Sequence, residues 1–102
     1  MTSKVRKRME IIQCIVKNYG IECGDKVFMG LWDLFGNINN TWNAKHFVNS
    51  KKYPTVSSHG YFLADYNFYL MGRAVRDTLK KTGCFELRQS HDNKSEYLVG
   101  KL

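Results

Sequence analysis

Tyrosines and basic residues recur at three- and four-residue steps in one stretch of the sequence, which is the spacing of one helix face. They are Tyr66, Tyr69, Arg73, Arg76 and Lys80, and Lys81 extends the basic end. An arginine can bridge the two acceptors on a guanine edge, and tyrosine hydroxyls can reach phosphates. The spacing therefore predicts a surface that fits the major groove of double-stranded DNA, with Arg73 as the first candidate for base reading and Arg76 as the second.

Two further polar groups are candidates for the same role. Ser57, Ser58 and His59 lie just upstream, where hydroxyl and backbone N–H groups can either hold a phosphate or cap a turn. A polar run downstream can touch the DNA backbone or the minor groove. Its candidate residues are Arg88, His91, Asn93 and Lys94. A solvated hairpin tip explains this run equally well, because Asp92 and Glu96 dilute its positive charge.

A helix followed by a β-hairpin must position these residues. A helix is predicted over residues 65–82, where Asp65 can cap the start and Gly83 can close the end. Its apolar side carries Phe68, Met71, Val75 and Leu79. Residues 84–88 then alternate with period two, residues 89–94 are polar, and residues 96–99 return as a second strand, which predicts the hairpin.

The first half of the chain shows two more helical patterns. Residues 5–19 form the first, and Gly20 ends it. Its apolar residues are Val5, Met9, Ile12, Val16 and Tyr19. Residues 25–35 form the second, from Asp25 as N-cap to Gly36 at the end. Its apolar residues are Phe28, Leu31, Trp32 and Phe35. Residues 37–53 are rich in Asn and Lys, with a brief helix predicted at 43–49, and Pro54 with residues 55–60 predicts a loop.

Three helices and a hairpin, with a single glycine between the last helix and the first strand, resemble the winged-helix branch of the helix-turn-helix proteins. The specific match is residues 73–88, where a helix ends in a basic turn and Gly83 and an apolar residue follows, together with residues 96–99. The resemblance covers about residues 62–100 and departs from the family at the long segment 37–64. It implies an α+β, mainly α fold, a winged helix-turn-helix with three main helices and a C-terminal β-hairpin. It also implies DNA binding through the third helix and a wing at 84–99.

Composition agrees with an anionic partner. The chain has 102 residues, 43% of them hydrophobic, which predicts a single domain over 1–102 with a modest core. Its formal net charge of +7 favours nucleic acid, although basic domains without such a partner exist. Lys4, Arg6, Lys7 and Arg8 form either an arm on phosphates or a solvated helix start, and a middle patch holds Lys45, Lys51 and Lys52.

Enzymatic and metal chemistry have no sequence support. Cys14, Cys23 and Cys84 form no C-x-x-C pair, which favours a reducing compartment over a disulfide framework or a zinc finger. His46, His59 and His91 are scattered, and no phosphate-loop, zinc-hydrolase or serine-hydrolase motif is present. We therefore expect no enzyme, no cofactor and no metal. The sequence also shows no membrane or export signal.

The aromatic residues allow two interpretations. Seven of them are candidates for stacking on unpaired bases or, more simply, for core and dimer contacts. They are Trp32, Phe35, Trp42, Phe47, Tyr61, Phe62 and Tyr97.

These observations lead to one main expectation and two alternatives. We expect a sequence-specific transcription regulator that binds double-stranded DNA as a homodimer, in the cytoplasm with the nucleoid or inside a host cell if its source is viral. The dimer surface is expected on the first helix or on the aromatic segment after Gly36. The alternatives are a winged-helix adaptor that meets an acidic protein of the transcription machinery, and an RNA-binding module.

Overall fold

The first helix forms where the sequence predicts it. The structure is a computed structural model that describes residues 2–43, 59–62 and 68–101. Helix α1 (Ser3–Tyr19) begins after Thr2, whose hydroxyl accepts a hydrogen bond from the Val5 N–H at 3.2 Å. It ends before Gly20, whose N–H donates to the Val16 carbonyl at 2.8 Å. The predicted apolar residues from Val5 to Val16 are buried, but Tyr19 is 46% exposed because the chain leaves the helix directly after it.

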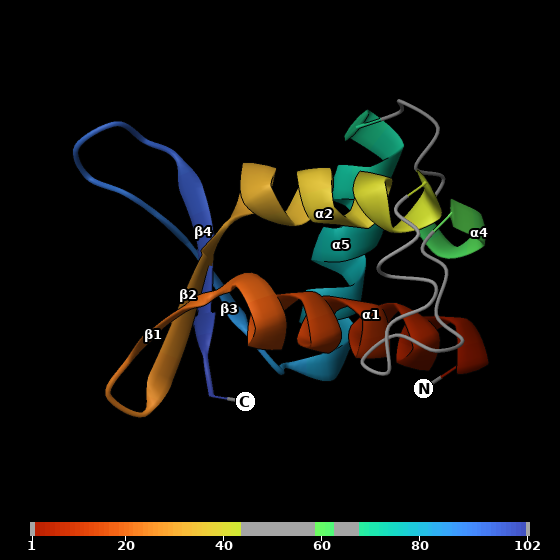
Figure 1. Ribbon diagram of the computed structural model, residues 1–102, viewed down its shortest axis with the longest axis horizontal. Helices are drawn as coiled ribbons and strands as arrows, with labels where there is room; N and C mark the ends of the chain where they lie inside the picture. Colours follow the sequence, from red (N-terminus) through yellow and green to blue (C-terminus); the bar gives the residue numbers. More distant parts are fainter. Residues whose placement is uncertain (1, 44–58, 63–67, 102) are drawn as a thin grey trace.

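Two hairpins combine into one antiparallel sheet with the strand order β1-β2-β4-β3. Strands β1 (Ile21–Cys23) and β2 (Lys26–Gly30) follow α1, and strands β3 (Glu86–Gln89) and β4 (Glu96–Gly100) lie near the end of the chain. β2 pairs with β4, which joins the hairpins at the centre of the sheet. Figure 1 shows the sheet at one end of the molecule, with α1, α2 and α5 on the same side of it.

The helix predicted over residues 25–35 is wrong for residues 25–30 and confirmed for residues 31–35, which belong to a longer helix. Residues 21–30 form the β1–β2 hairpin with Gly24 at φ +64° in its turn, and helix α2 (Leu31–Asn43) begins only at Leu31. Gly36 consequently lies inside α2 rather than at a helix end. A short apolar run can fit both a helical period and the alternation of Val27 and Met29, which are the buried residues of β2. Residues 26–30 form a strand because they pair with β4, which comes from the far end of the chain.

One hydrophobic core lies between the sheet and the helices. Helix α5 (Phe68–Thr82) buries Met71, Val75 and Leu79, as predicted. Other elements supply the rest of the core, which includes Ile12, Ile15, Met29, Leu34, Phe35, Ile38, Phe62 and Leu98. Phe62 belongs to the four-residue helix α4 (His59–Phe62). α5 crosses α2 at Gly72, where an added Cβ would lie 3.3 Å from the Phe35 ring. The small residue therefore permits this close approach.

The junction between α5 and the second hairpin also follows the prediction. Gly83 has φ +65° and donates its N–H to the Leu79 carbonyl at 2.8 Å, which ends α5 at Thr82. β3 begins at Glu86, two residues later than expected, because its pairing with β4 begins at Glu86, opposite Val99. Phe85, just before the strand, is buried in the core.

The coarse fold class, α+β and mainly helical, is thus confirmed. None of the described helices is both long and apolar enough to cross a membrane. Several sequence predictions lie outside the described residues: Asp65, residues 44–49 of the helix at 43–49, and residues 54–58 of the loop at 54–60. The loop prediction is wrong for residues 59 and 60, which begin helix α4.

Candidate nucleic-acid interface

The outward side of α5 carries the predicted basic stripe. Tyr69 is 74% exposed, and Arg73, Arg76 and Lys80 are exposed on the same side of the helix. The Arg73 guanidinium lies 5.9 Å from the centroid of the Tyr69 ring, within cation–π range. Because the apolar side of α5 is buried in the core, these polar groups face solvent as the spacing predicts.

Arg76 is held by the hairpin. Its guanidinium donates to the Glu96 carboxylate on β4 at 2.9 Å, and the two side chains are 47% and 38% exposed. This contact links the middle of α5 to the second strand of the hairpin. Sequence reasoning treated Arg76 as an open reading residue and did not foresee this partner, which lies beyond an intervening turn and strand.

A groove runs between α5 and β3. It has a volume of about 280 Å³ and is lined by Arg76, Leu79, Lys80, Phe85 and Leu87. Its apolar residues pack against the core, while the two cations lie along the helix. The groove therefore places positive charge beside the hairpin that the sequence predicts as a wing.

Two other predicted contact residues are neutralised locally. Lys81 pairs with Asp77 at 3.1 Å, and Arg88 pairs with Glu86 at 2.9 Å. The hydrogen bond from Arg88 lowers the pKa of the Glu86 carboxyl, and the same contact raises the pKa of Arg88. All four side chains are about half exposed. Each pair is thus a weak surface contact that a phosphate can replace.

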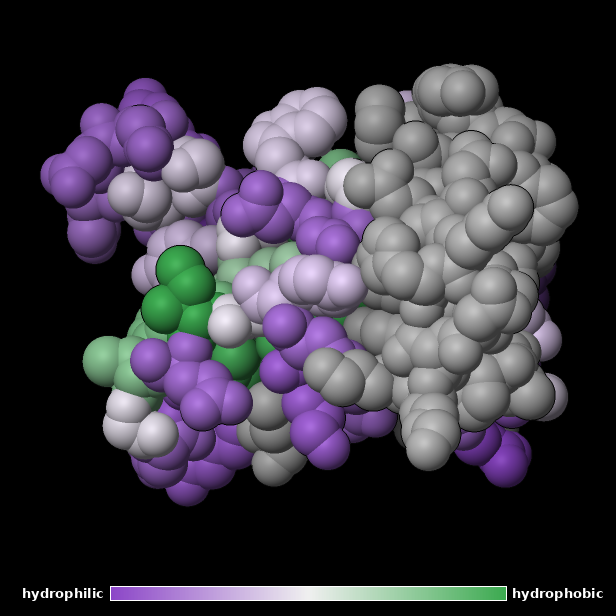
Figure 2. Space-filling view, in the orientation of Figure 1, coloured by the Kyte–Doolittle hydropathy of each residue, from purple (hydrophilic) through white to green (hydrophobic). Residues whose placement is uncertain are grey.

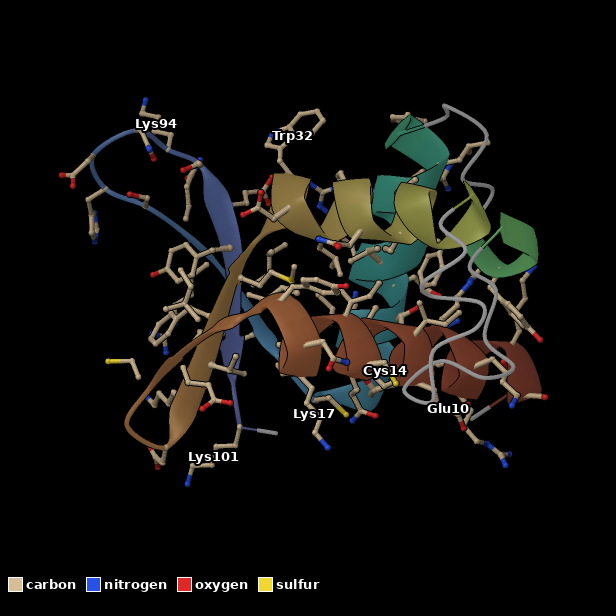
Figure 3. The ribbon with its side chains drawn as sticks, in the orientation of Figure 1. Glu10, Cys14, Lys17, Trp32, Lys94 and Lys101 are labelled. Atoms are coloured by element: carbon tan, nitrogen blue, oxygen red, sulfur yellow. The ribbon has the colours of Figure 1, made fainter. Side chains whose placement is uncertain are left out.

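The tip of the hairpin is a tight polar turn. The Asn93 side-chain oxygen accepts hydrogen bonds from the Ser95 N–H and hydroxyl, so this predicted contact residue shapes the turn. The Gln89 amide donates to the Lys94 carbonyl at 2.8 Å, and Lys94 adopts φ 58°. Figure 3 shows Lys94 at the free end of the hairpin, with its side chain projecting from the molecule. His91 is also exposed.

The structure brings one arginine of the N-terminal cluster to α5. Arg8 donates through Nε to the Tyr61 carbonyl at 2.7 Å, and its guanidinium lies 5.9 Å from the Phe62 ring centroid. A cavity of about 310 Å³ is lined by Arg8, Phe62, Leu70, Arg73, Ala74 and Asp77. Sequence spacing could not predict that Arg8 and Arg73 line one cavity, because tertiary packing of α1, α4 and α5 brings them together.

The other candidates can be placed only in part. Ser57, Ser58 and Tyr66, together with the patch of Lys45, Lys51 and Lys52, lie outside the described residues, and His59 opens α4 with its side chain not described. Trp32, expected in the core or a dimer contact, is 69% exposed and contacts Phe35 edge to face, with ring centroids 5.8 Å apart. It is therefore not a core residue.

A second cavity lies on α1 and holds a thiol. It has a volume of about 460 Å³ and is lined by Glu10, Gln13, Cys14 and Lys17. Figure 3 shows Glu10, Cys14 and Lys17 on the opposite side of the molecule from Lys94. Burial and the nearby Glu10 carboxylate raise the pKa of the Cys14 thiol. Within residues 2–43, 59–62 and 68–101, no group of three or more His, Cys, Asp or Glu side chains gathers closely enough to hold a metal ion.

Comparison with known proteins adds no relative to this description: no protein-family model, no curated protein and no solved structure matches the chain.

Proposed function

We propose that this chain is a winged-helix transcription regulator that binds double-stranded DNA in a sequence-dependent manner. The proposal is carried by the exposed stripe of Tyr69, Arg73, Arg76 and Lys80 on a helix whose opposite side is core. A net charge of +7 and the hairpin that follows α5 through Gly83 support it further. α5 would enter the major groove, and the β3–β4 hairpin would act as the wing.

The dimensions of the stripe suit a half-site. Tyr69 and Lys80 are eleven positions apart, which corresponds to about 16 Å along a helix at about 1.5 Å per residue. At about 3.4 Å per base step, this length covers roughly five base pairs. A major groove of about 12 Å admits one such helix.

Each charged residue has a distinct proposed role. Arg73 lies in the middle of the stripe and stacks on Tyr69. Asp77, which lines the same cavity, is paired with Lys81, so we assign base reading to Arg73. Lys80, at the groove beside β3, binds phosphate. Arg76 links α5 to the hairpin through Glu96, and Lys94 reaches the DNA backbone from the hairpin tip.

One copy presents one stripe of this kind, so we further propose that the protein acts as a homodimer on a palindromic site. The apolar residues of α1 are used within the chain, since Ile11, Ile12, Ile15 and Val16 are buried. The dimer surface is therefore sought among exposed apolar residues such as Trp32 rather than on the apolar face of α1.

Selection of bound duplexes from a random pool tests the proposal. The wild-type chain should enrich one motif arranged as a palindrome, and Arg73→Ala should reduce the base preference at positions of that motif. Lys17→Ala is the matched control, because Lys17 is an exposed cation on α1, outside the α5 stripe, and Figure 3 shows it on the opposite side of the molecule from Lys94. A pool without enrichment contradicts sequence-specific binding. Capture of an acidic protein without any DNA shift would instead identify an adaptor, and preferential competition by structured RNA would identify an RNA-binding module.

A further inference from the structure

The sheet has a second face that the helices do not cover. Val27, Met29, Leu87 and Leu98 point into the core, and α1, α2 and α5 lie on their side of the sheet (Figure 1). Side chains alternate along a strand, so the intervening residues lie on the opposite, outer face. The outer face is built from Ile21, Phe28, Tyr97, Val99, Glu86 and Arg88. No described helix lies on that side (Figure 1).

Two aromatic rings occupy the centre of the outer face. Phe28 on β2 and Tyr97 on β4 are half-buried, and their ring centroids are 6.3 Å apart. The strands that carry them are adjacent and central in the sheet. Val99 lies directly opposite Phe28 and is 3% exposed, although it is not part of the main core cluster. The two rings therefore lie together at the centre of the face, where the adjoining Val99 is covered by its neighbours.

This surface continues to the edge of the sheet. Ile21 on β1 lies opposite Phe28, and 73% of its surface is exposed, a fraction close to that of Tyr69. Figure 2 shows hydrophobic surface, in green, at the β1–β2 end of the molecule, bordered by hydrophilic side chains in purple. An exposed isoleucine beside two aromatic rings makes an apolar patch that faces outward.

Cations border the patch. Arg88 lies opposite Tyr97 and interacts electrostatically with it, while Lys26 lies at the other end of the face, close enough to Glu86 to act on its carboxylate. Lys101 continues β4 and pairs with Asp25 at 3.2 Å, both side chains being more than two-thirds exposed. Exposed pairs of this kind are weak, so a phosphate can replace the carboxylate. The patch thus has aromatic rings at its centre and, at its edges, cations whose carboxylate partners a phosphate can replace.

The size of the outer face bears on whether a protein or unpaired bases would occupy it. Four strands about 4.8 Å apart and up to five residues long, at about 3.3 Å each, give a plane of roughly 300 Å². A stable protein interface buries about 800 Å² of accessible surface on each partner, so the small extent of this face favours a small occupant over a second copy or a folded protein. Two or three unpaired bases do fit, since aromatic residues on neighbouring strands are a common support for stacked bases.

We propose that the outer face of the sheet binds single-stranded nucleic acid, with successive bases stacked on Phe28 and Tyr97 and their phosphates beside Lys26 and Arg88. This site is separate from the stripe on α5, which lies on the helical side of the sheet. It requires no duplex and does not depend on the function proposed above.

Binding of a fluorescent oligothymidine, which has no duplex structure, tests this inference by anisotropy at low salt. The wild-type chain should bind, and Tyr97→Leu should weaken binding by about 5- to 150-fold, as the loss of one base–aromatic stack does. Tyr97→Phe keeps the ring and should keep the affinity. Arg73→Ala, on α5, should weaken duplex binding and leave oligothymidine binding intact, so failures of the two proposals are distinguishable.

A second measurement covers the case in which Tyr97→Leu does not fold, which circular dichroism would reveal. Combined Lys26→Gln and Arg88→Gln changes, both at exposed positions, should then weaken oligothymidine binding and flatten its salt dependence. Three results would overturn the inference: no oligothymidine binding by the wild-type chain, equal binding by a folded Tyr97→Leu variant, or a dimer in sedimentation that Ile21→Lys dissociates. The last would assign the face to a second copy of the chain.

Discussion

The exposed cations of α5 differ in how firmly they are held. Arg76 and Lys81 have carboxylate partners, Glu96 and Asp77, whereas Arg73 stacks on Tyr69 of its own helix. Ion pairs at such exposure contribute about 0–1 kcal/mol, so none of these contacts prevents a side chain from turning to a ligand. The arrangement nevertheless makes Arg73 the guanidinium with the least competition from carboxylates.

Replacing Arg73 and Lys80 should have different consequences on DNA. Arg73→Ala should reduce the preference for the selected duplex over a scrambled one by about 1–3 kcal/mol, because a base-edge contact is lost. Lys80→Ala should weaken binding to both duplexes alike. It should also reduce the slope of the logarithm of affinity against the logarithm of salt concentration by about 1, because one phosphate contact is lost. Affinities for both duplexes over a range of salt concentrations measure this. Equal losses on both sequences from both changes would contradict the reading role of Arg73.

The three cysteines should react at different rates. Cys23 is exposed on β1, whereas Cys14 and Cys84 are half-buried. The raised pKa of Cys14 lowers its thiolate fraction at any pH below that pKa, and the thiolate is the reactive form. Iodoacetamide at mildly alkaline pH, followed by peptide mass spectrometry, should therefore label Cys23 before Cys14. Earlier labelling of Cys14 would show that this side of α1 is open.

Elements with long, uninterrupted periodicity could be predicted from the sequence, whereas the element that depends on a distant partner could not. α1 and α5 show helical spacing over several turns and carry clear end signals at Gly20 and Gly83. The helix predicted from residue 25 is wrong up to residue 30, because the β1–β2 hairpin is stabilised by the pairing of β2 with β4. The alternation of Val27 and Met29 beside the Gly24–Asp25 turn was the available signal.

The crossing of α2 and α5 predicts opposite behaviour for two glycines. Gly36→Ala should stabilise the fold by about 0.5–1 kcal/mol, because α2 gains helix propensity and the new methyl meets nothing within 4 Å. Gly72→Ala places its methyl 3.3 Å from Phe35 and 2.9 Å from the Arg76 guanidinium, so both must move. Overpacking of this kind costs about 1–3 kcal/mol.

Urea unfolding of the two variants measures the difference. Gly36→Ala serves as the propensity control, and Gly72→Ala should be the less stable variant. Equal stabilisation by both substitutions would mean that α5 and α2 do not approach each other as closely as the structure shows.

The junction between α5 and the hairpin depends on one backbone conformation. Gly83→Ala should destabilise the fold by about 1–2 kcal/mol, because φ +65° is costly for a residue with a Cβ. Gly83→Asn should lose less, since asparagine tolerates this region better. Thermal unfolding compares the two variants. An alanine variant as stable as the wild type would show that the chain does not take this conformation at the helix end.

At the scale of the whole molecule, the sheet separates two surfaces of different character. On the helical side, the α5 stripe and its groove form the proposed duplex surface; on the outer side, aromatic residues lie among cations. The stripe could be predicted because it depends only on local helical spacing. The Arg76–Glu96 pair, the proximity of Arg8 to Arg73 and the outer face could not, because each depends on how separate elements pack.

The most direct test of the central claim is an NMR titration of the ¹⁵N-labelled chain with the selected duplex. We expect the largest amide shifts on α5 between Tyr69 and Lys80 and at the hairpin tip around Lys94, while the exposed residues around Lys17 on α1 stay unchanged. Shifts centred on α1 or on the β1–β2 hairpin, with α5 silent, would contradict it.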